Sequence, residues 1–405
     1  MIYRPTYYYT LLLITLLMSS CQSELPMVSL GIDETYHIAR MQKLLLQPAF
    51  TGHQYRWSTA DGRLLSTDRD YIFLSDKEGR HNLVLDIIDD ETPYHHEFTV
   101  NVMHEEIEYS PYISHVYEYR PAPGQFINEM PKYEPGDTEA SMAQKAEDCI
   151  SGKNDIMISL GAYGGYVTFG FDHTVINVPG EKDFRIWGNA FYELLNPEKK
   201  GGSCEPGIVW VSYDTNCNGL PDDPWYELAG SHYYNMHTKH NYALTYHAPD
   251  PDRKIYSQGP FINDVEYIRW TDSNDSTGYI HRNTFHSQDY YPKWLDEQSY
   301  TLSGSCLPRN AYDTSGNGTY YILQSFDWGY VDNHPNDLAD LNSFDISWAV
   351  DNDGNKVHLP GVDFIRVQTG INQYCGWIGE TSTELSKAAD LHINTGPIIP
   401  PDPLE

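Results

Sequence analysis

The chain has 405 residues, and its 26 basic and 57 acidic residues give a net charge of −31, which argues against unaided binding to nucleic acids or anionic membranes. That length exceeds what one hydrophobic core usually needs, so we expect at least two domains. A hydrophobic content of 40% with 33 Tyr, 13 Phe and 9 Trp excludes a largely disordered chain, and the aromatic residues with 30 Gly and 25 Pro favour strands and turns over helices.

The N-terminal segment has the layout of a bacterial export signal. Arg4 precedes an apolar run from Leu11 to Met18, and two small residues lie before Cys21. The run is shorter than the roughly 20 apolar residues that a membrane-spanning helix needs. Its end resembles the lipobox of bacterial lipoproteins, in which the cysteine is acylated. We therefore predict a lipoprotein signal peptide over residues 1–21 with lipid attached at Cys21, the alternative being an ordinary cleavable signal.

Residues 22–103 predict a small β-sandwich. Phe98, Val100 and Val102 alternate with polar neighbours, which is the period of a half-buried strand. The segment Tyr55-Arg56-Trp57, the turn at Asp61-Gly62 and the strand Leu83 to Asp86 resemble a PKD or related immunoglobulin-like domain. That resemblance implies a spacer or adhesive module.

The segment 104–137 holds five prolines without a sustained period, and we predict a linker or a strap laid on the next domain. Asp137-Thr138 then caps a predicted short helix that ends before Gly152. A capping-box pattern at Thr381 and Glu384 predicts a second short helix near Glu384 to Leu391.

Between these helices the pattern is almost entirely one of strands. Eight or more strands in residues 138–393 predict a large β-sandwich of jelly-roll type, followed by a flexible tail at 394–405. The predicted fold class is all-β: an N-terminal immunoglobulin-like sandwich and a larger jelly-roll-type sandwich with a few short helices. The predicted strands are Tyr166 to Phe171, Phe184 to Trp187, Ile208 to Tyr213, Tyr242 to Tyr246, Val265 to Trp270, Tyr320 to Phe326, Phe344 to Val350 and Phe364 to Thr369.

The acidic segment from Asp214 to Asp223 resembles the calcium loop of EF-hand and dockerin-type motifs. Oxygen-bearing side chains recur at alternate positions, with Gly219 at the sharp turn, an arrangement that wraps a hard cation. Position 12 of the loop is Trp225 rather than a bidentate glutamate, and a plain Asx-rich turn is the alternative. We predict a structural calcium ion, with these ligands: Asp214, Asn216, Asn218, Leu220, Asp222 and Asp223.

Aromatic residues are dense in the large domain. Trp and Tyr beside Asn and Asp form platforms for sugars and other planar, hydroxylated ligands, although any single ring is as well explained by burial. The loops Asp327 to Asn333 and His286 to Tyr291 are the predicted lining of such a site. The candidate ligand-binding residues are Trp328, Tyr330, His286, Tyr290 and Trp225. The tryptophans of this region are Trp187, Trp210, Trp225, Trp270, Trp294, Trp328, Trp348 and Trp377.

The sequence contains none of the common catalytic motifs, such as HExxH, G-x-S-x-G or a P-loop. Asp172-His173 is the best acid/base candidate, and a structural Asp-His hydrogen bond explains it equally well. We therefore predict a protein that is not an enzyme. Five cysteines remain after Cys21, and an odd number cannot all pair, so any disulfide is optional stabilisation.

Several longer strings resemble a family of cell-surface lipoproteins of gut Gram-negative anaerobes over about residues 109–393. The strings include Gly161 to Gly165, Phe171 to Val175, Asp183 to Phe191, Trp225 to Ser231 and Gly379 to Glu384. Genes of that family often lie near cobalamin-uptake genes.

The resemblance implies a protein lipid-anchored to the outer membrane at the cell surface. It also implies an accessory role beside a TonB-dependent outer-membrane transporter, with a corrinoid or a glycan as ligand. A secreted glycan hydrolase and a structural or adhesive surface protein are the alternatives.

Overall fold

The computed structural model describes residues 30–89, 93–104, 108–178, 180–194 and 200–393. The predicted signal peptide with Cys21 and the predicted tail 394–405 lie outside these residues. By residue contacts the chain divides into two compact units. The first unit combines Met1–Tyr36, Leu46–Tyr71 and Asn82–Thr99, and the second combines His37–Leu45, Ile72–His81 and Val100–Glu405.

The N-terminal strands form a five-stranded sheet in the order β1-β7-β6-β3-β4 and a two-stranded sheet of β2 and β5. Trp57 of the Tyr55-Arg56-Trp57 motif is 1% exposed. Its ring centroid lies 5.5 Å from that of Tyr71 and 6.2 Å from that of Phe98, so rings from both sheets meet in one core. The strands are β1 (Thr35–Ala39), β2 (Leu44–Leu46), β3 (Gln54–Thr59), β4 (Leu64–Ser66), β5 (Tyr71–Phe73), β6 (Gly79–Ile88) and β7 (Pro93–Met103).

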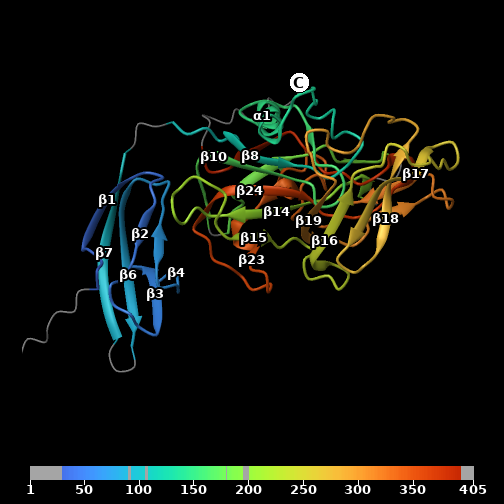
Figure 1. Cartoon of the computed structure of the whole chain (residues 1–405). Coiled ribbons are helices and arrows are strands. Elements are labelled where there is room, and N and C mark those ends of the chain that lie inside the picture. The colour runs from blue at the N-terminus through green and yellow to red at the C-terminus, as the bar shows by residue number, and fades with distance from the viewer. Residues whose placement is uncertain (1–29, 90–92, 105–107, 179, 195–199, 394–405) are drawn as a thin grey trace, which may run out of the picture. The chain divides into compact units, whose positions relative to one another are not determined.

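The helix predicted after Thr138 is confirmed as α1 (Glu139–Ile150). The Thr138 hydroxyl accepts a hydrogen bond from the Ser141 amide, and the Ser141 hydroxyl accepts one from the Thr138 amide, which together close a capping box. The buried face of the helix packs on β8 (His115–Arg120), as Figure 1 shows near the top of the view. Strand β8 lies within the predicted linker 104–137, which therefore contributes an edge strand to the large domain.

A six-stranded antiparallel sheet in the order β23-β15-β14-β24-β10-β8 forms the centre of the large domain. One face carries Val167, Val209 and Val367, which are fully buried and are cross-strand partners, so this face lies on the core. The strands are β10 (Tyr166–Ile176), β14 (Gly207–Ser212), β15 (Trp225–Leu228), β23 (Ala349–Val350) and β24 (Gly361–Thr369).

A four-stranded sheet in the order β18-β17-β16-β19 lies beside the central sheet and shares its hydrophobic core. Smaller sheets complete the domain. The strands are β16 (Lys239–His247), β17 (Ile262–Asp272), β18 (Thr277–Asn283), β19 (Ser299–Cys306), β9 (Ile158–Ser159) with β25 (Glu384–Leu385), β11 (Phe184–Trp187) with β22 (Ser343–Phe344) and β26 (Lys387–Asp390), and β12 (Phe191–Tyr192) with β13 (Gly201–Ser203), β21 (Tyr321–Gln324) and β20 (Ala311–Asp313).

The all-β prediction is confirmed, but two predicted elements differ. The helix predicted over Glu384 to Leu391 is wrong, because this segment forms β25 and β26, and β26 pairs with β11. The strand predicted over Phe344 to Val350 is interrupted by a 3-10 turn at Ile346–Trp348. The other 3-10 turns are Ala339–Asn342 and Gly376–Ile378.

None of the five cysteines among the described residues forms a disulfide. No helix in the described part of the chain is both long and apolar enough to span a bilayer.

Candidate functional site

An aromatic pocket of about 310 Å³ opens between the β17–β18 hairpin, the β20–β21 hairpin and the segment that follows β24. We call it the Trp270 pocket. It draws on positions from 162 to 380, so no local motif reveals it. Its lining residues are Ala162, Tyr163, Trp270, Tyr279, Ile280, His281, Arg309, Tyr321, Ile371, Asn372, Gln373, Tyr374 and Glu380.

Trp270 is held against the backbone of the neighbouring strand. Trp270 of β17 is the cross-strand partner of Gly278 of β18, and a Cβ atom at position 278 would lie 2.1 Å from the indole ring. Glycine at this position lets the ring lie flat over the hairpin. Trp270 is half-buried, and the neighbouring Tyr279 is half-buried too, so both contribute ring surface to the pocket.

This packing gives a prediction for Gly278→Ala. The added methyl displaces the Trp270 ring and leaves every polar group of the pocket in place, so we expect any ligand of this pocket to bind at least about tenfold more weakly, equivalent to 1.4 kcal/mol. Binding is measured by calorimetry, and unfolding is measured in parallel. Gly62→Ala, where a Cβ meets nothing within 4 Å, is the control for a glycine-to-alanine change on another sheet; its φ of 91° makes this control the more strained of the two variants. Unchanged binding by folded Gly278→Ala would show that the indole position is irrelevant.

His281 and Tyr374 form a ring pair with polar atoms that lack protein partners. Their ring centroids lie 4.3 Å apart at 47°. The buried atoms His281 Nδ1 and Tyr374 Oη have no hydrogen-bond partner, and buried polar groups of this kind usually find one. Burial lowers the pKa of His281, so the imidazole is neutral at pH 7. The pair therefore offers unused hydrogen-bonding capacity at the pocket wall.

Glu380 supplies the only carboxyl group among the described residues that line the Trp270 pocket. Its two oxygens accept hydrogen bonds from the Gln125 amide nitrogen at 2.6 Å and from Gln125 Nε2 at 3.2 Å. Burial raises the pKa of Glu380 to about 7 against these bonds, so the group changes charge near neutral pH. The carboxyl oxygens can accept hydrogen bonds, and the protonated form can also donate one.

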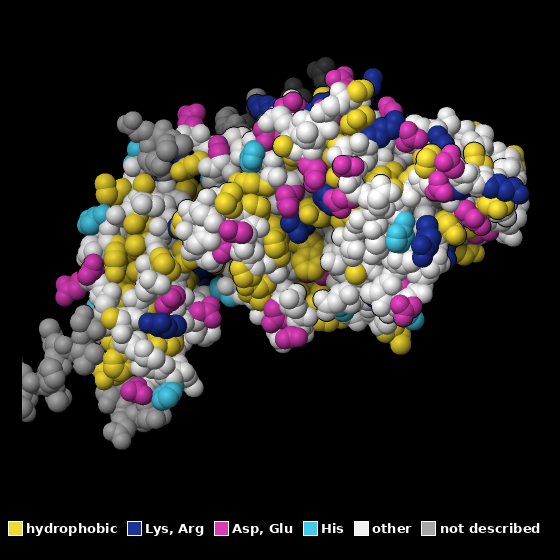
Figure 2. Space-filling model, viewed as in Figure 1, with side chains coloured by type: hydrophobic (Ala, Val, Ile, Leu, Met, Phe, Trp, Pro, Cys, Tyr) yellow, Lys and Arg dark blue, Asp and Glu magenta, His cyan; other side chains and the backbone are white. Residues whose placement is uncertain are grey.

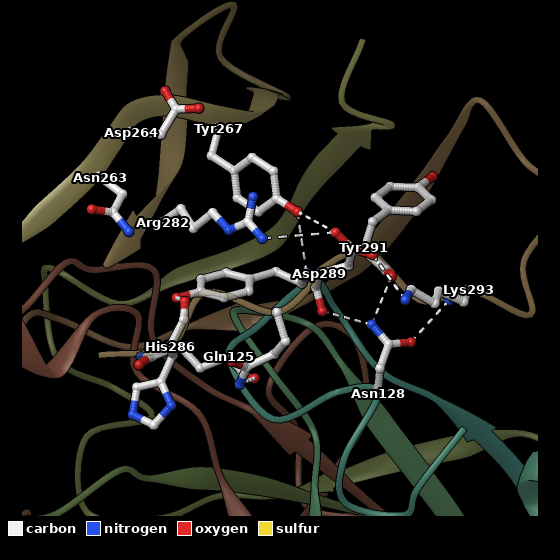
Figure 3. Close-up of polar contacts among 12 residues, drawn as sticks. Gln125, Asn128, Asn263, Asp264, Tyr267, Arg282, His286, Asp289, Tyr291 and Lys293 are labelled. Atoms are coloured by element: carbon white, nitrogen blue, oxygen red, sulfur yellow. Dashed lines mark hydrogen bonds and ion pairs between the residues drawn. The ribbon is translucent and has the colours of Figure 1, made fainter. Parts of the chain in front are cut away.

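Figure 3 shows Gln125 beside His286, where it connects the pocket to the loop after β18. Gln125 Oε1 accepts a hydrogen bond from Asn283 Nδ2 at 2.6 Å, and the Asn283 amide donates to Tyr290 Oη. The Tyr290 hydroxyl donates to the His286 carbonyl at 2.8 Å. Tyr290 is fully buried. The prediction that its ring faces a ligand is therefore corrected: the ring lies in the core and its hydroxyl braces the wall behind Glu380.

The rest of this loop is held by polar contacts centred on Asp289 (Figure 3). The Asp289 carboxylate lies 2.8 Å from Lys293 Nζ and 3.9 Å from the Arg282 guanidinium. Asn128 Nδ2 donates to the carbonyls of Asp289 and Tyr291. His286 is half-buried, and its ring packs edge-on against Phe126 at 4.8 Å. The loop is thus a packed strap, and the structure does not place it as an open aromatic platform.

One exposed cationic side chain lines the pocket, and one exposed indole lies on a turn between two lining residues. Among the described residues, no hydrogen bond or ion pair reaches the guanidinium of Arg309, which is exposed. Tyr374 and Glu380 are bridge partners, and the turn between them carries Trp377, which is 42% exposed. A ligand larger than the pocket would therefore meet a cation and a further indole at its edge.

The remaining predicted ligand residues lie apart from this pocket. Trp328 is 38% exposed and its ring lies 4.6 Å from that of Trp348, whereas Tyr330 is 1% exposed and its hydroxyl accepts a hydrogen bond from the His232 amide. Tyr330 therefore serves the core. Trp225 is half-buried on β15 with the Arg366 guanidinium 4.3 Å from its ring centroid. The five predicted residues do not form one site.

The predicted calcium loop folds around its own amides. The Asp214 carboxylate accepts hydrogen bonds from the Asn218 and Gly219 amides, and Asn218 Oδ1 accepts one from the Leu220 amide. The Asp222 carboxylate accepts bonds from Asn218 Nδ2. Among the described residues, the three acidic side chains of the loop do not converge within 4.8 Å of one another. The buried Asp223 Oδ2 has no partner. The six predicted ligands share one loop, and calcium binding there stays a prediction.

Three buried carboxyl groups meet elsewhere in the domain, in what we call the acid cluster: Glu205, Asp332 and Glu384. One oxygen of each lies within 4.8 Å of the others. Asp332 accepts hydrogen bonds from the amides of Asn189, Ala190 and Glu384. Burial and mutual repulsion raise the pKa values, to about 8 for Glu384 and well above its usual range for Glu205, while burial raises that of Asp332 to about 7. Protons can hold this cluster together, and so could a cation.

Asp172 and His173, the acid/base candidate, form a structural ion pair. His173 Nδ1 lies 2.7 Å from Asp172, and its Nε2 lies 2.8 Å from Asp390 of β26. Burial favours the neutral ring, but the two carboxylates outweigh it and raise the pKa of His173. The side chain of His173 is fully buried, so it fastens β26 to β10 and is not open to a substrate.

Comparisons with known proteins give only distant likenesses. No protein-family model matches the sequence, and no curated protein matches it significantly. A SusE-like protein is similar at 10% identity, covering 83% of this chain and 86% of its own, with a TM-score of 0.29. A structure of β-sandwich carbohydrate-binding modules is similar at 10% identity over 88% and 94% of the chains, with a TM-score of 0.14. A quinonprotein alcohol dehydrogenase-like protein from Bacteroides thetaiotaomicron is similar at 14% identity over 23% and 22%, with a TM-score of 0.18. Likeness at these TM-scores identifies neither a shared fold nor a shared function.

Proposed function

We propose that this chain is a lipid-anchored protein of the bacterial cell envelope that binds a glycan in the Trp270 pocket without converting it. The observation that carries the proposal is the composition of that pocket. Half-buried Trp270 and Tyr279 offer ring faces, and His281 and Tyr374 bring polar atoms without partners. Sugar rings present apolar faces and equatorial hydroxyls, which aromatic rings and unpaired polar groups complement.

Pocket size and charge also support a saccharide. A volume of about 310 Å³ lies at the lower end of the roughly 300–1,000 Å³ typical of small-molecule sites, which suits one or two sugar rings. Glycoside hydrolysis generally uses a pair of carboxyl groups, and among the described lining residues Glu380 is the single one. This supports capture over hydrolysis.

A corrinoid is the second candidate, favoured by one observation. His281 presents a neutral imidazole in an aromatic pocket, and neutral imidazole is a good ligand for transition metals. The macrocycle exceeds the pocket, so it would have to extend over the mouth toward Arg309 and Trp377.

One titration series separates these readings. The full mature chain is titrated by calorimetry with neutral and acidic oligosaccharides and, separately, with cyanocobalamin while the visible spectrum is recorded. If an oligosaccharide releases heat on binding to the wild type and not on titration into Trp270→Ala, a glycan is the ligand of the Trp270 pocket. A shift of the cobalamin absorption that His281→Ala removes would replace the glycan by the corrinoid. Release of shorter sugars from a polysaccharide panel would contradict a non-catalytic role, and no binding by either class would overturn the proposal.

We propose further that the Asp214–Asp223 loop binds a structural calcium ion. A ligand that binds only the folded state raises its stability, by about 2.7 kcal/mol at a hundredfold excess over Kd. We expect 5 mM calcium to raise Tm relative to EDTA, and Asp214→Asn to lose the increase. The loop Asp351–Asn355, a hairpin turn, supplies the matched control Asp353→Asn. An equal Tm of the wild type in calcium and in EDTA would show that this loop binds no stabilising calcium ion.

The outer-membrane location and a TonB-dependent transporter as partner complete the proposal. Both follow from the lipobox and the family resemblance. Labelling of the lipid after growth with a tagged fatty acid, lost in Cys21→Ser, tests the anchor. Co-purification with a transporter from detergent-solubilised outer membranes tests the partner.

A further inference from the structure

A second cavity, of about 340 Å³, lies between the central sheet and the β16–β19 strands. We call it the Glu227 cavity. It shares no lining residue with the Trp270 pocket. Figure 2 shows hydrophobic side chains, with a basic one beside them, gathered on this face of the molecule where Figure 1 places β15 and β16.

Hydrogen bonds fix the position of the Glu227 side chain. His240 Nε2 lies 3.1 Å from the Tyr233 carbonyl, which can only accept, so Nε2 donates this hydrogen bond. His240 Nδ1 lies 3.0 Å from Ser305 Oγ. Ser305 Oγ donates to Glu227 Oε2 at 2.5 Å. These bonds therefore hold Glu227 Oε2 at the wall of the cavity.

Glu227 is 3% exposed, and burial raises its pKa to about 8. Its other oxygen, Oε1, accepts no hydrogen bond from the described residues. That oxygen remains available as an acceptor toward the cavity that Glu227 lines.

Residues of both sheets form the walls of the Glu227 cavity. Trp210 of β14 is the cross-strand partner of Glu227, is half-buried, and is fixed by a hydrogen bond from Nε1 to Gln368 Oε1. Opposite it, the register of β16 against β19 shifts between Lys239 and Tyr242, and Asn241 has φ of 55°. A bulge of this kind re-aims side chains, and a left-handed asparagine is retained where the surroundings hold it.

The charge of the lining restricts the ligand. Among the described residues the lining contains no lysine or arginine. It includes Asp351, whose pKa is lowered by hydrogen bonds from the Asn355 backbone and side chain, so this group is ionised at pH 7. An anionic ligand would meet only this negative charge, whereas hydroxyls can bond to Glu227 Oε1 and an apolar ring face can lie on the indole.

We propose that the Glu227 cavity is a second binding site, and that it takes a neutral saccharide ring stacked on Trp210 with a hydroxyl donating to Glu227. The site stands on its own residues, so it holds whether or not the Trp270 pocket binds a glycan.

The test compares three variants of the full mature chain by calorimetry and saturation-transfer NMR. The probes are the neutral disaccharides cellobiose, maltose and chitobiose, with digalacturonic acid as the anionic probe. Trp210→Ala removes the platform and should weaken a neutral probe at this site at least tenfold. Glu227→Gln keeps the shape of the side chain and an oxygen that accepts hydrogen bonds, so its affinity should stay within about twofold. Glu227→Met removes both oxygens of the side chain and should lose binding. This variant provides the test if Trp210→Ala fails to fold.

Stoichiometry separates this site from the Trp270 pocket. Two sites in the wild type, one in Trp270→Ala and none in Trp270→Ala with Glu227→Met support both proposals. Binding that Glu227→Met abolishes and Trp270→Ala leaves intact supports the second site alone. The second site is overturned if Glu227→Met and Trp210→Ala are folded and bind every neutral probe as the wild type does. It is also overturned if digalacturonic acid binds there more tightly than the neutral probes.

Discussion

Replacing Trp270 by alanine should weaken glycan binding by about thirtyfold or more, which corresponds to the roughly 2 kcal/mol that a central aromatic residue contributes at a binding hot spot. The indole is the largest ring of the pocket and is held over Gly278, so its loss removes the stacking surface without a substitute nearby. Calorimetric titration with the oligosaccharide that binds the wild type most tightly measures the effect.

Trp328→Ala is the matched control for this variant. Trp328 is also partly exposed, at 38%, but its ring packs against Trp348 away from the Trp270 pocket. We expect Trp328→Ala to bind as the wild type does. If Trp328→Ala loses binding and Trp270→Ala does not, the ligand binds at the loop Asp327 to Asn333, as the sequence pattern predicted. The Trp270 pocket is then not the ligand site.

Tyr374→Phe gives a finer version of the same experiment. The change removes only the hydroxyl, which has no protein partner, so folding should be unaffected. A hydrogen bond from this hydroxyl to the ligand would contribute about 0.5–1.5 kcal/mol, so affinity should fall about two- to thirteenfold. Unchanged affinity would mean that Tyr374 faces the ligand with its ring alone.

The sequence predicts well those elements whose pattern is local. Helix α1 follows from the cap at Thr138 and the helical spacing of its apolar residues, and the strand over Phe184 to Trp187 has the predicted bounds. Glu384 shows the limit. Its spacing from Thr381 suits a capping box, yet its side chain bonds to Ser159 and Ser382, and the segment pairs with β9 and β11. Tertiary pairing overrides a local signal of this size.

Burial of aromatic residues limits the prediction of the site in the same way. Tyr290 and Tyr330 stand in polar loops, but their rings are buried, and only tertiary packing decides which rings face out. Trp270 carries a weak local signal, since a tryptophan facing a glycine across a hairpin is a recognised packing pair. The partners His281, Arg309 and Tyr374 come from separate segments, so the sequence alone could not group them.

The acid cluster leads to the other large effect, a loss of stability as pH rises. The unfolded glutamates titrate near 4.5, whereas burial and repulsion raise the pKa of Glu384 to about 8 and that of Glu205 further. Between these pH values the folded state keeps protons that the unfolded state has released. The free energy of unfolding therefore decreases from about pH 4.5 to pH 8, by on the order of 5 kcal/mol for one strongly shifted group.

Glu384→Gln isolates this contribution, because the amide oxygen can still accept the hydrogen bonds from Ser159 and Ser382. We expect the variant to match the wild type at pH 5.5 and to exceed its free energy of unfolding by about 3 kcal/mol at pH 8.5. Urea unfolding at both pH values, with EDTA present so that no cation neutralises the cluster, measures the difference. The exposed Glu266→Gln should follow the wild type at each pH. Parallel behaviour of Glu384→Gln and the wild type would mean that the three carboxyl groups are ionised in the folded state and that something other than protons holds them together.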